Sequence, residues 1–225
     1  MIIRRWSLYH SVELSILGHH DEPVPHTFYR QDGEAEHLAM ILPGLGYSCD
    51  MPLLYYSAKL LLSSGADVLL VEYDYRQAWK DESLSLPDKL SRVYADVYAA
   101  AGSALAQRDY ADFTLVGKSL GTFAITHLLE ADLALRPQSC IYLTPLLANE
   151  QLKADVIRTC PRKLFVVGTA DRYHNPDLLA EVIEATDSDL LLVEGANHSL
   201  EFPGDVLGSM QTLEKVVRRI QDFLA

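Results

Sequence analysis

The chain has 225 residues, of which 49% are apolar and 22% are charged, a balance typical of a globular protein rather than a disordered one. The formal net charge of −12 argues against nucleic acid as a partner, because phosphate binding needs clusters of Lys and Arg. No apolar run approaches the roughly 20 residues of a membrane span, and Met1–Trp6 lacks the features of a signal peptide, so we expect a cytoplasmic protein with no membrane partner.

The segment before Leu38 has a different pattern from the rest of the chain. His10–Leu17 alternates polar with apolar side chains, as a half-buried strand does. Thr27–Gln31 has the character of a second short strand, and turn-forming residues lie on both sides of it. We therefore expect an antiparallel edge strand or a hairpin that leads into the main sheet.

From Leu38 onward, short apolar runs alternate with longer stretches of helical spacing. The expected strands are Leu38–Leu42, Ala66–Glu72, Phe113–Val116, Cys140–Leu143, Lys163–Val167 and Leu190–Glu194. The clearest expected helices are Pro52–Ser64, Pro87–Gln107 and Asp205–Leu224, with a short one at Glu150–Thr159. This alternation predicts an α/β fold with a mostly parallel central sheet and helices on both faces. Nothing in the sequence marks a linker, so residues 1–225 are expected to form a single domain.

One motif points to chemistry. The expected strand Phe113–Val116 leads into Gly117-Lys-Ser119-Leu-Gly121, and a helical stretch follows. A G-x-S-x-G sequence between a strand and a helix is typical of a nucleophile elbow, a strained turn that projects the serine hydroxyl above the sheet. The two glycines are expected because the tight turn leaves no room for side chains there. The alternative is a glycine-lined turn in which Ser119 only caps the helix.

A phosphate-binding loop is the other interpretation of the same residues. That loop needs a glycine five residues before the glycine of Gly-Lys-Ser. Position 112 is Asp, so the cradle of backbone N–H groups would be missing and we reject an ATPase.

A serine hydroxyl needs a base to take its proton and an acid to orient that base. Behind a nucleophile elbow the chain order is Ser, then Asp or Glu, then His, with the later residues in loops after strands. Asp171 follows the strand Lys163–Val167, and His198 follows Leu190–Glu194. We therefore expect Ser119, Asp171 and His198 to form the catalytic triad. His174 as the base and Asp177 as the acid are the weaker alternatives.

At this point the chain resembles the α/β-hydrolase superfamily. The matching segments are Leu42–Gly46, Gly117–Gly121, Gly168–Asp171 and Gly195–His198, and the resemblance runs from about residue 38 to the C-terminus. It implies an oxyanion hole formed by the backbone N–H groups of Leu45 (with Gly46 as the alternative donor) and Leu120. The chain departs from many members in having Pro43-Gly44 where they have His-Gly.

The resemblance also bears on the substrate. Only Leu147–Arg162 lies between two successive strands where many members insert a cap, so the chain is similar to small, lidless esterases. Residues that follow strands are expected to line the pocket: Gly46, Tyr47, Tyr75, Pro145, Leu146 and Tyr173. We expect a serine hydrolase that cleaves a small carboxylic ester or thioester through an acyl-enzyme on Ser119, with a small molecule as its partner and no cofactor. A small-peptide amidase and a non-catalytic binding protein on the same fold are the alternatives, and nothing in the sequence indicates whether the protein is a homo-oligomer.

Four other features invite a chemical interpretation. His19-His20 beside Asp21 lacks a third ligand at suitable spacing, so no metal site is expected there. His127 and Cys49 are expected to serve packing. Lys118 could contact an anionic substrate or a carboxylate; the alternative, which we favour, is that its side chain points aside and extends toward solvent.

Overall fold

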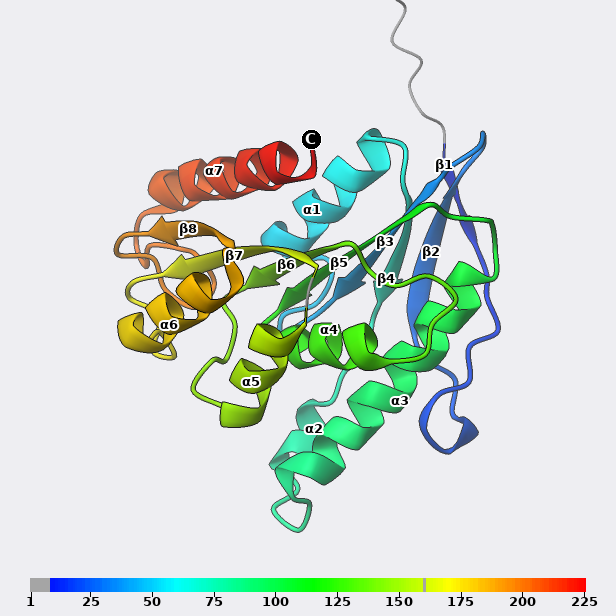
Figure 1. Cartoon of the computed structure of the whole chain (residues 1–225), viewed down its shortest axis with the longest axis horizontal. Coiled ribbons are helices and arrows are strands. Elements are labelled where there is room, and N and C mark those ends of the chain that lie inside the picture. The colour runs from blue at the N-terminus through cyan, green and yellow to red at the C-terminus, as the bar shows by residue number, and fades with distance from the viewer. Residues whose placement is uncertain (1–8, 160) are drawn as a thin grey trace, which may run out of the picture.

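A computed structural model describes residues 9–159 and 161–225 of the chain. The expectation that concerns Met1–Trp6 lies outside these residues. Within them the backbone forms an eight-stranded sheet in the order β1-β2-β4-β3-β5-β6-β7-β8 (Figure 1). β2 runs antiparallel to both β1 and β4, and every other neighbouring pair is parallel.

The described strands are β1 (Tyr9–Val12), β2 (His26–Gln31), β3 (His37–Leu42), β4 (Asp67–Val71), β5 (Asp112–Lys118), β6 (Ser139–Leu143), β7 (Arg162–Gly168) and β8 (Asp189–Val193). The described helices are α1 (Pro52–Ser63), α2 (Arg76–Lys80), α3 (Leu86–Leu105), α4 (Gly121–Glu130), α5 (Glu150–Arg158), α6 (Pro176–Thr186) and α7 (Val206–Leu224), with a short 3-10 turn at His19–Asp21.

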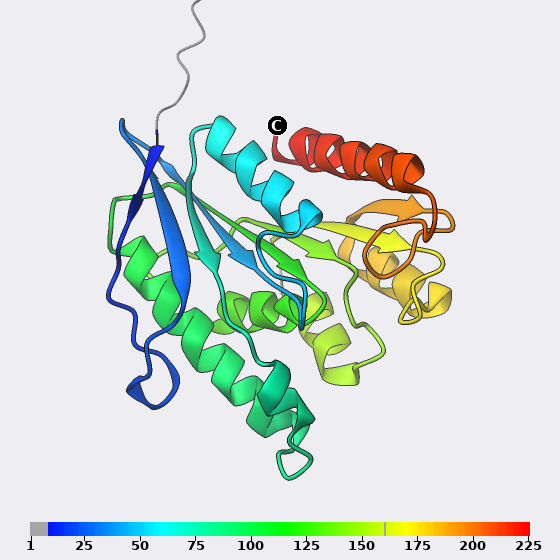
Figure 2. The same ribbon diagram turned by 180° about the vertical axis from the view of Figure 1, so that it is seen from behind.

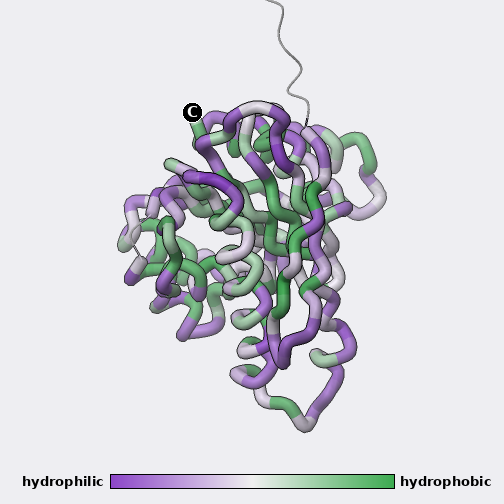
Figure 3. The backbone as a smooth tube through the Cα atoms, turned by 90° about the vertical axis from the view of Figure 1, so that its right-hand side faces the viewer, coloured by the Kyte–Doolittle hydropathy of each residue, from purple (hydrophilic) through white to green (hydrophobic). Residues whose placement is uncertain are grey.

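The helices cover both faces of the sheet. α1 and α7 lie side by side on one face, and α3, α4, α5 and α6 lie on the other (Figures 1 and 2). Each face buries its own hydrophobic cluster, because the side chains of successive strand residues point to opposite faces. Figure 3 shows the result: hydrophobic residues are concentrated in the strands, and hydrophilic residues in the loops. None of the helices in the described ranges is long and apolar enough to cross a membrane.

Parallel pairing brings the ends of the central strands together. Leu42 is in register with Gly117, Lys118 with Leu143, and Gly168 with Val193. The loops that follow β3, β5, β6, β7 and β8 therefore leave the same edge of the sheet. All of the expected triad residues belong to these loops, which is the usual place for a ligand site in a parallel sheet.

The predicted fold class is confirmed, and most strand and helix boundaries lie within two residues of those expected. Pro87 and Pro176 lie in the first turns of α3 and α6, where a missing N–H is tolerated. Ser85 and Asp88 form a reciprocal capping box that begins α3. Asn175 accepts hydrogen bonds from two backbone N–H groups at the start of α6.

One prediction about secondary structure was wrong, and one short helix was not predicted. The strand expected over His10–Leu17 ends at Val12, and Leu17 makes only an isolated bridge to Pro23. Ile16 is nevertheless 3% exposed, so its apolar character reflects packing against the core rather than a sheet ladder. The short helix α2 was not predicted, because five residues are too few to show a helical period.

Candidate active site

Ser119 lies between the end of β5 and the start of α4. Its φ of 51° is in the left-handed region, which a residue with a side chain adopts only under strain. Its backbone N–H donates to the carbonyl oxygen of Leu143 at 3.0 Å, which ties the turn to β6. The turn has the geometry of the nucleophile elbow that the sequence predicts.

The flanking glycines have the steric role expected of them. A Cβ added to Gly117 would lie 2.5 Å from the carbonyl oxygen of Gly121. One added to Gly121 would lie 2.2 Å from the carbonyl oxygen of Leu42. Both contacts are with backbone atoms, so a side chain at either position would push the elbow away from β3 or α4.

His198 and Asp171 are in direct contact. Nδ1 of His198 lies 2.7 Å from Oδ2 of Asp171, and Oδ1 of Asp171 accepts the backbone N–H of Tyr173 at 2.9 Å. Asp171 is 5% exposed, whereas 24% of the His198 side chain is exposed. The imidazole is thus partly open to solvent, while the carboxylate behind it is enclosed.

The environment favours the charged form of Asp171. Burial alone raises its pKa, but the hydrogen bonds from His198 and from the backbone N–H of Tyr173 lower it, and so do the charges of His198 and Lys118. The net effect is a pKa below the usual value. A carboxylate that stays ionised can hold the imidazole in one tautomer and stabilise it when it gains a proton.

The loop that contains His198 is held in shape by Asn197. The Oδ1 atom of Asn197 accepts the backbone N–H groups of Ser199 at 2.8 Å and Glu201 at 3.1 Å. Leu200 closes the turn with a φ of 57°. The ring of Tyr173 meets that of His198 edge-on at 5.0 Å and forms one wall beside the base.

The loop after β3 makes a tight turn next to Ser119. Gly44 and Tyr47 exchange two backbone hydrogen bonds, at 3.1 and 3.2 Å, so that Leu45 and Gly46 form the exposed tip. A Cβ added to Gly44 would lie 3.3 Å from Cβ of Ser119, which shows how closely this loop approaches the nucleophile. Leu45, the expected oxyanion donor, belongs to this loop.

The other expected oxyanion donor, Leu120, is the N-cap residue of α4. The first N–H groups of a helix have no partner within it, and the helix dipole favours negative charge at this end. Tyr73, which sequence reasoning missed, donates its hydroxyl to the carbonyl oxygen of Pro43 at 2.9 Å and so orients the Pro43–Gly44 peptide. Its place directly after β4 is the only signal that could have identified it.

The expected pocket residues differ in how far they are exposed. Tyr173 is exposed beside His198, and Gly46 is exposed at the tip of the β3 loop. Pro145 and Leu146 follow β6 at the same edge of the sheet, the first buried and the second half-buried. Tyr47 is buried and accepts the backbone N–H of Leu53 at 3.1 Å. Burial raises the pKa of Tyr47 to about 12.

Tyr75 does not fit the expectation that it lines the pocket. It is 6% exposed, its ring stacks on Tyr73, and its hydroxyl donates to Asp96 of α3 at 2.5 Å. The chain turns back toward α3 after β4, so a residue four positions beyond this strand lies in the core rather than in the cleft.

Two hollows border the site. One of about 320 Å³ lies between the His198 loop and the start of α7 and is lined by residues that include Tyr47, Ser199 and Phe202. The other, of about 430 Å³, adjoins the β3 loop at Gly44, Gly46 and Tyr73. Neither hollow is lined by Ser119 or His198 themselves; they adjoin the loops that flank these residues.

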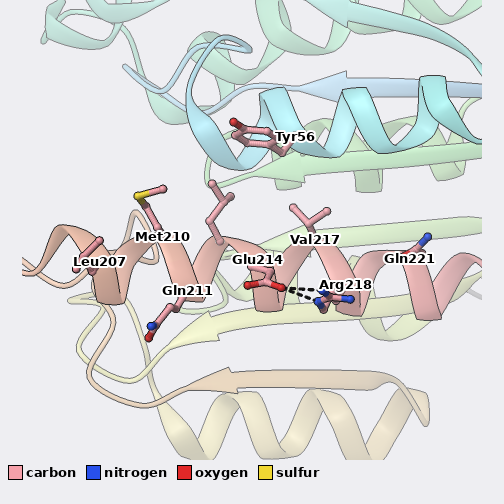
Figure 4. A pocket seen from close by; sticks show the side chains of 9 residues that line it. Tyr56, Leu207, Met210, Gln211, Glu214, Val217, Arg218 and Gln221 are labelled. Carbon is pink, nitrogen blue, oxygen red and sulfur yellow. Dashed lines mark hydrogen bonds and ion pairs between the residues drawn. The ribbon is translucent and has the colours of Figure 1, made fainter.

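A larger groove of about 680 Å³ lies between α1 and α7 (Figure 4). Met210 and Val217 point from α7 toward α1, where Tyr56 faces them, and Glu214 pairs with Arg218 at 2.7 Å on the outer side of α7. No residue of the expected site lines this groove, so its size is no guide to the chemistry.

Lys118 is where the structure departs most from expectation. The prediction that its side chain extends to solvent is wrong, because it is 1% exposed. Its ammonium group donates to the carbonyl oxygen of His198 at 2.9 Å and to Oγ1 of Thr144 at 3.2 Å. The residue next to Ser119 is therefore bound to the backbone of His198.

The remaining chemical candidates lie elsewhere or have structural partners. The rings of His19 and His20 stack on each other, and His127 stacks on Tyr94 of α3 at 4.3 Å. Cys49 is 2% exposed, and burial raises the pKa of its thiol. In the described part of the chain, no three His, Cys, Asp or Glu side chains are grouped so that they could hold a metal ion.

Several solved structures have a similar fold. The "XC6422" protein of Xanthomonas campestris, described as a serine hydrolase without lid, has 20% identity, a TM-score of 0.67, and coverage of 95% of this chain and 93% of its own. A dienelactone hydrolase of Anabaena variabilis has 17% identity, a TM-score of 0.69, and coverage of 98% of both chains. Est1E of Butyrivibrio proteoclasticus with bound ferulic acid has 13% identity, a TM-score of 0.68, and coverage of 95% of this chain and 99% of its own.

At these identities the likeness shows the fold alone, and no curated protein matches the chain in sequence. The family model described as "Alpha/beta hydrolase domain" matches residues 36–225. With the strand order and the elbow already described, this match means that the chain belongs to the α/β-hydrolase family.

Proposed function

We propose that the protein is a serine hydrolase that cleaves a small carboxylic ester or thioester. The observation that supports this most is the 2.7 Å contact between His198 and a buried Asp171, at the same sheet edge as the strained Ser119. A histidine that is only a surface residue gains nothing from a buried carboxylate next to its ring. A histidine that acts as a base needs such a carboxylate to hold the ring in one orientation and tautomer.

The reaction follows from these groups. His198 takes the hydroxyl proton of Ser119 as the oxygen attacks the carbonyl carbon, and the N–H groups of Leu45 and Leu120 stabilise the negative oxygen. The protonated His198 then gives its proton to the leaving alcohol or thiol, so that an acyl group remains on Ser119. Water, deprotonated by the same imidazole, releases the acid and restores the serine.

The size of the substrate is limited by what covers the site. The connection between β6 and β7 contains only the short helix α5, where a cap would otherwise enclose a long acyl chain. A chain that stays in water gains little of the roughly 0.8 kcal/mol available per buried methylene. We therefore expect acyl groups from acetate to about hexanoate to be preferred to palmitate.

The test has two parts. A fluorophosphonate probe should label the wild-type protein at Ser119 and leave Ser119→Ala unlabelled. Ser57→Ala, which removes a buried serine of α1, is the matched control and should be labelled normally. On a series of p-nitrophenyl esters, Ser119→Ala should lower kcat by at least about 1,000-fold.

Four results would contradict the proposal. Near-normal turnover by Ser119→Ala would show that Ser119 is not the nucleophile. A kcat/KM that still rises for acyl chains longer than about ten carbons would show that a buried channel holds the acyl chain. A wild-type protein that takes neither probe nor ester would support a binding protein on this fold. Turnover of small peptide amides but not of esters would instead favour an amidase.

A further inference from the structure

The feature that the proposed reaction leaves unexplained is a buried lysine beside the nucleophile. Lys118 is the last residue of β5, and its side chain is among the largest that are fully buried, with 1% exposed. Moving an ammonium group out of water is strongly unfavourable unless polar partners replace the water. The partners of Lys118 therefore indicate why it is there.

Those partners come from several loops. The carbonyl oxygen of His198, in the loop after β8, lies 2.9 Å from Nζ of Lys118. The hydroxyl of Thr144, after β6, lies 3.2 Å from the same nitrogen. The ring of Tyr47, in the loop after β3, has its centroid 4.5 Å from the same nitrogen. With its own backbone at the end of β5, Lys118 joins the ends of four strands.

The contact with His198 is the one that matters for catalysis. Its ring is held by Asp171 through Nδ1, and its carbonyl oxygen is held by Lys118. A residue held at both its side chain and its main chain has little freedom to rotate or shift. The lysine that immediately precedes Ser119 thus sets the position of the base relative to the nucleophile.

Electrostatics make this anchor sensitive to pH. Burial lowers the pKa of Lys118 to about 8, although the charges of Asp171 and Glu201 raise it. The other groups that face it are the Tyr47 phenol, the Thr144 hydroxyl and His198 itself. Hydrogen bonds from a charged donor are roughly twice as strong as neutral ones, so the anchor weakens when Lys118 loses its proton.

We propose that Lys118 is a positioning residue that holds His198 in register with Ser119 through its bond to the main-chain carbonyl of the base. This inference rests on the proposed serine-hydrolase function. Lys118 itself does not touch the reacting atoms. Its effect is on how often the base is correctly placed, and it should appear in kcat rather than in KM.

The experiment compares two buried lysines. Lys118→Met removes the charge at similar length, and Lys163→Met does the same at the start of β7, where Lys163 is 4% exposed and bonds to the carbonyl oxygen of Thr159. We expect Lys118→Met to lower kcat about 100-fold, the scale of a misplacement of about 1 Å, with KM changed by less than about threefold. Lys163→Met should leave kcat unchanged.

The pH profile separates positioning from a loss of stability. The wild-type kcat/KM should fall as pH rises through about 8, where Lys118 loses its proton. Lys118→Arg keeps a permanent charge, so it should regain part of the lost kcat and lack this alkaline limb. An alkaline limb that persists in Lys118→Arg would overturn the proposal even if Lys118→Met fails to fold.

A measurement without substrate distinguishes this inference from the proposed function. In protein with ¹⁵N-labelled histidine, the downfield proton of the His198–Asp171 hydrogen bond should be sharp in wild type and in Lys163→Met. It should be broadened or lost in Lys118→Met. An unchanged signal in Lys118→Met, or equal loss of kcat in both lysine variants, would overturn the positioning role. Absence of fluorophosphonate labelling in wild type would instead overturn the hydrolase proposal while this signal still decides the role of Lys118.

Discussion

Two buried aspartates at opposite edges of the sheet have very different partners. Asp67 begins β4 and accepts hydrogen bonds from the backbone N–H of Gln31 at 2.7 Å and from the hydroxyl of Tyr110 at 2.8 Å. It also forms an ion pair with Arg108, whose Nε lies 3.1 Å from Oδ2. Asp171 follows the other end of β7 and accepts from His198 at 2.7 Å and from Tyr173 at 2.9 Å. Both carboxylates are enclosed, so burial alone does not separate a structural acid from a catalytic one.

The difference lies in the cation. Arg108 remains charged at any pH that a protein tolerates, so its pair with Asp67 is permanent and fastens β4 to the chain before β5. An imidazole can take up and release a proton during a reaction, and 24% of the His198 side chain is exposed. The two buried acids therefore differ in their partner: an arginine for Asp67 and a partly exposed histidine for Asp171.

The largest expected effect comes from replacing the acid of the reactive pair. Asp171→Asn should lower kcat by about 10,000-fold, because the amide can donate to Nδ1 and leave the proton on Nε2, where His198 can no longer accept from Ser119. The free energy of unfolding should change by only about 1 kcal/mol. Steady-state hydrolysis of a p-nitrophenyl ester and urea unfolding measure the two quantities. Activity within about tenfold of wild type would remove Asp171 from the triad.

Replacing Asp67 should have the opposite effect, a loss of stability with little change in kcat. Asp67→Asn leaves the Arg108 guanidinium beside a neutral group, and breaking a buried pair in this way costs about 3 kcal/mol of folding free energy. For a chain of this size we expect the melting temperature to fall by about 10 °C, while kcat stays within about twofold. Calorimetry and the same ester assay test it. A large loss of kcat with unchanged stability would show that the two edges of the sheet are coupled.

The smallest expected effect is the acid dependence of stability. The pKa of Asp171 lies below its usual value, so its contribution to stability is present above about pH 4, the reference value for an unfolded Asp. That contribution is lost as pH falls through the lower pKa of the folded state. The difference in unfolding free energy between wild type and Asp171→Asn should therefore shrink between about pH 5 and pH 3. Curves that stay parallel over this range would mean that the carboxylate is not selectively stabilised.

Much of the fold was predictable because the pattern is local. Apolar runs of strand length, helical spacing between them, and Pro87 and Pro176 at helix starts can all be identified without knowledge of contacts. The elbow was predictable for the same reason, since Gly117, Ser119 and Gly121 act within a single turn. Asp171 and His198 could be proposed because parallel strands deliver their following loops to one edge.

The sequence by itself therefore determined the element order, the elbow and which strand ends could supply an acid and a base. Only the tertiary structure decided where individual side chains point. Tyr75 follows a strand just as Tyr47 does, yet it packs against α3. The sequence places Lys118 next to Ser119. Its burial and its bond to the His198 carbonyl, however, depend on residues about 80 positions apart. The periodicity of apolar residues in the sequence shows which face of a helix or strand is buried. The partner of a buried charge is fixed only when loops that are distant in the sequence come together in the fold.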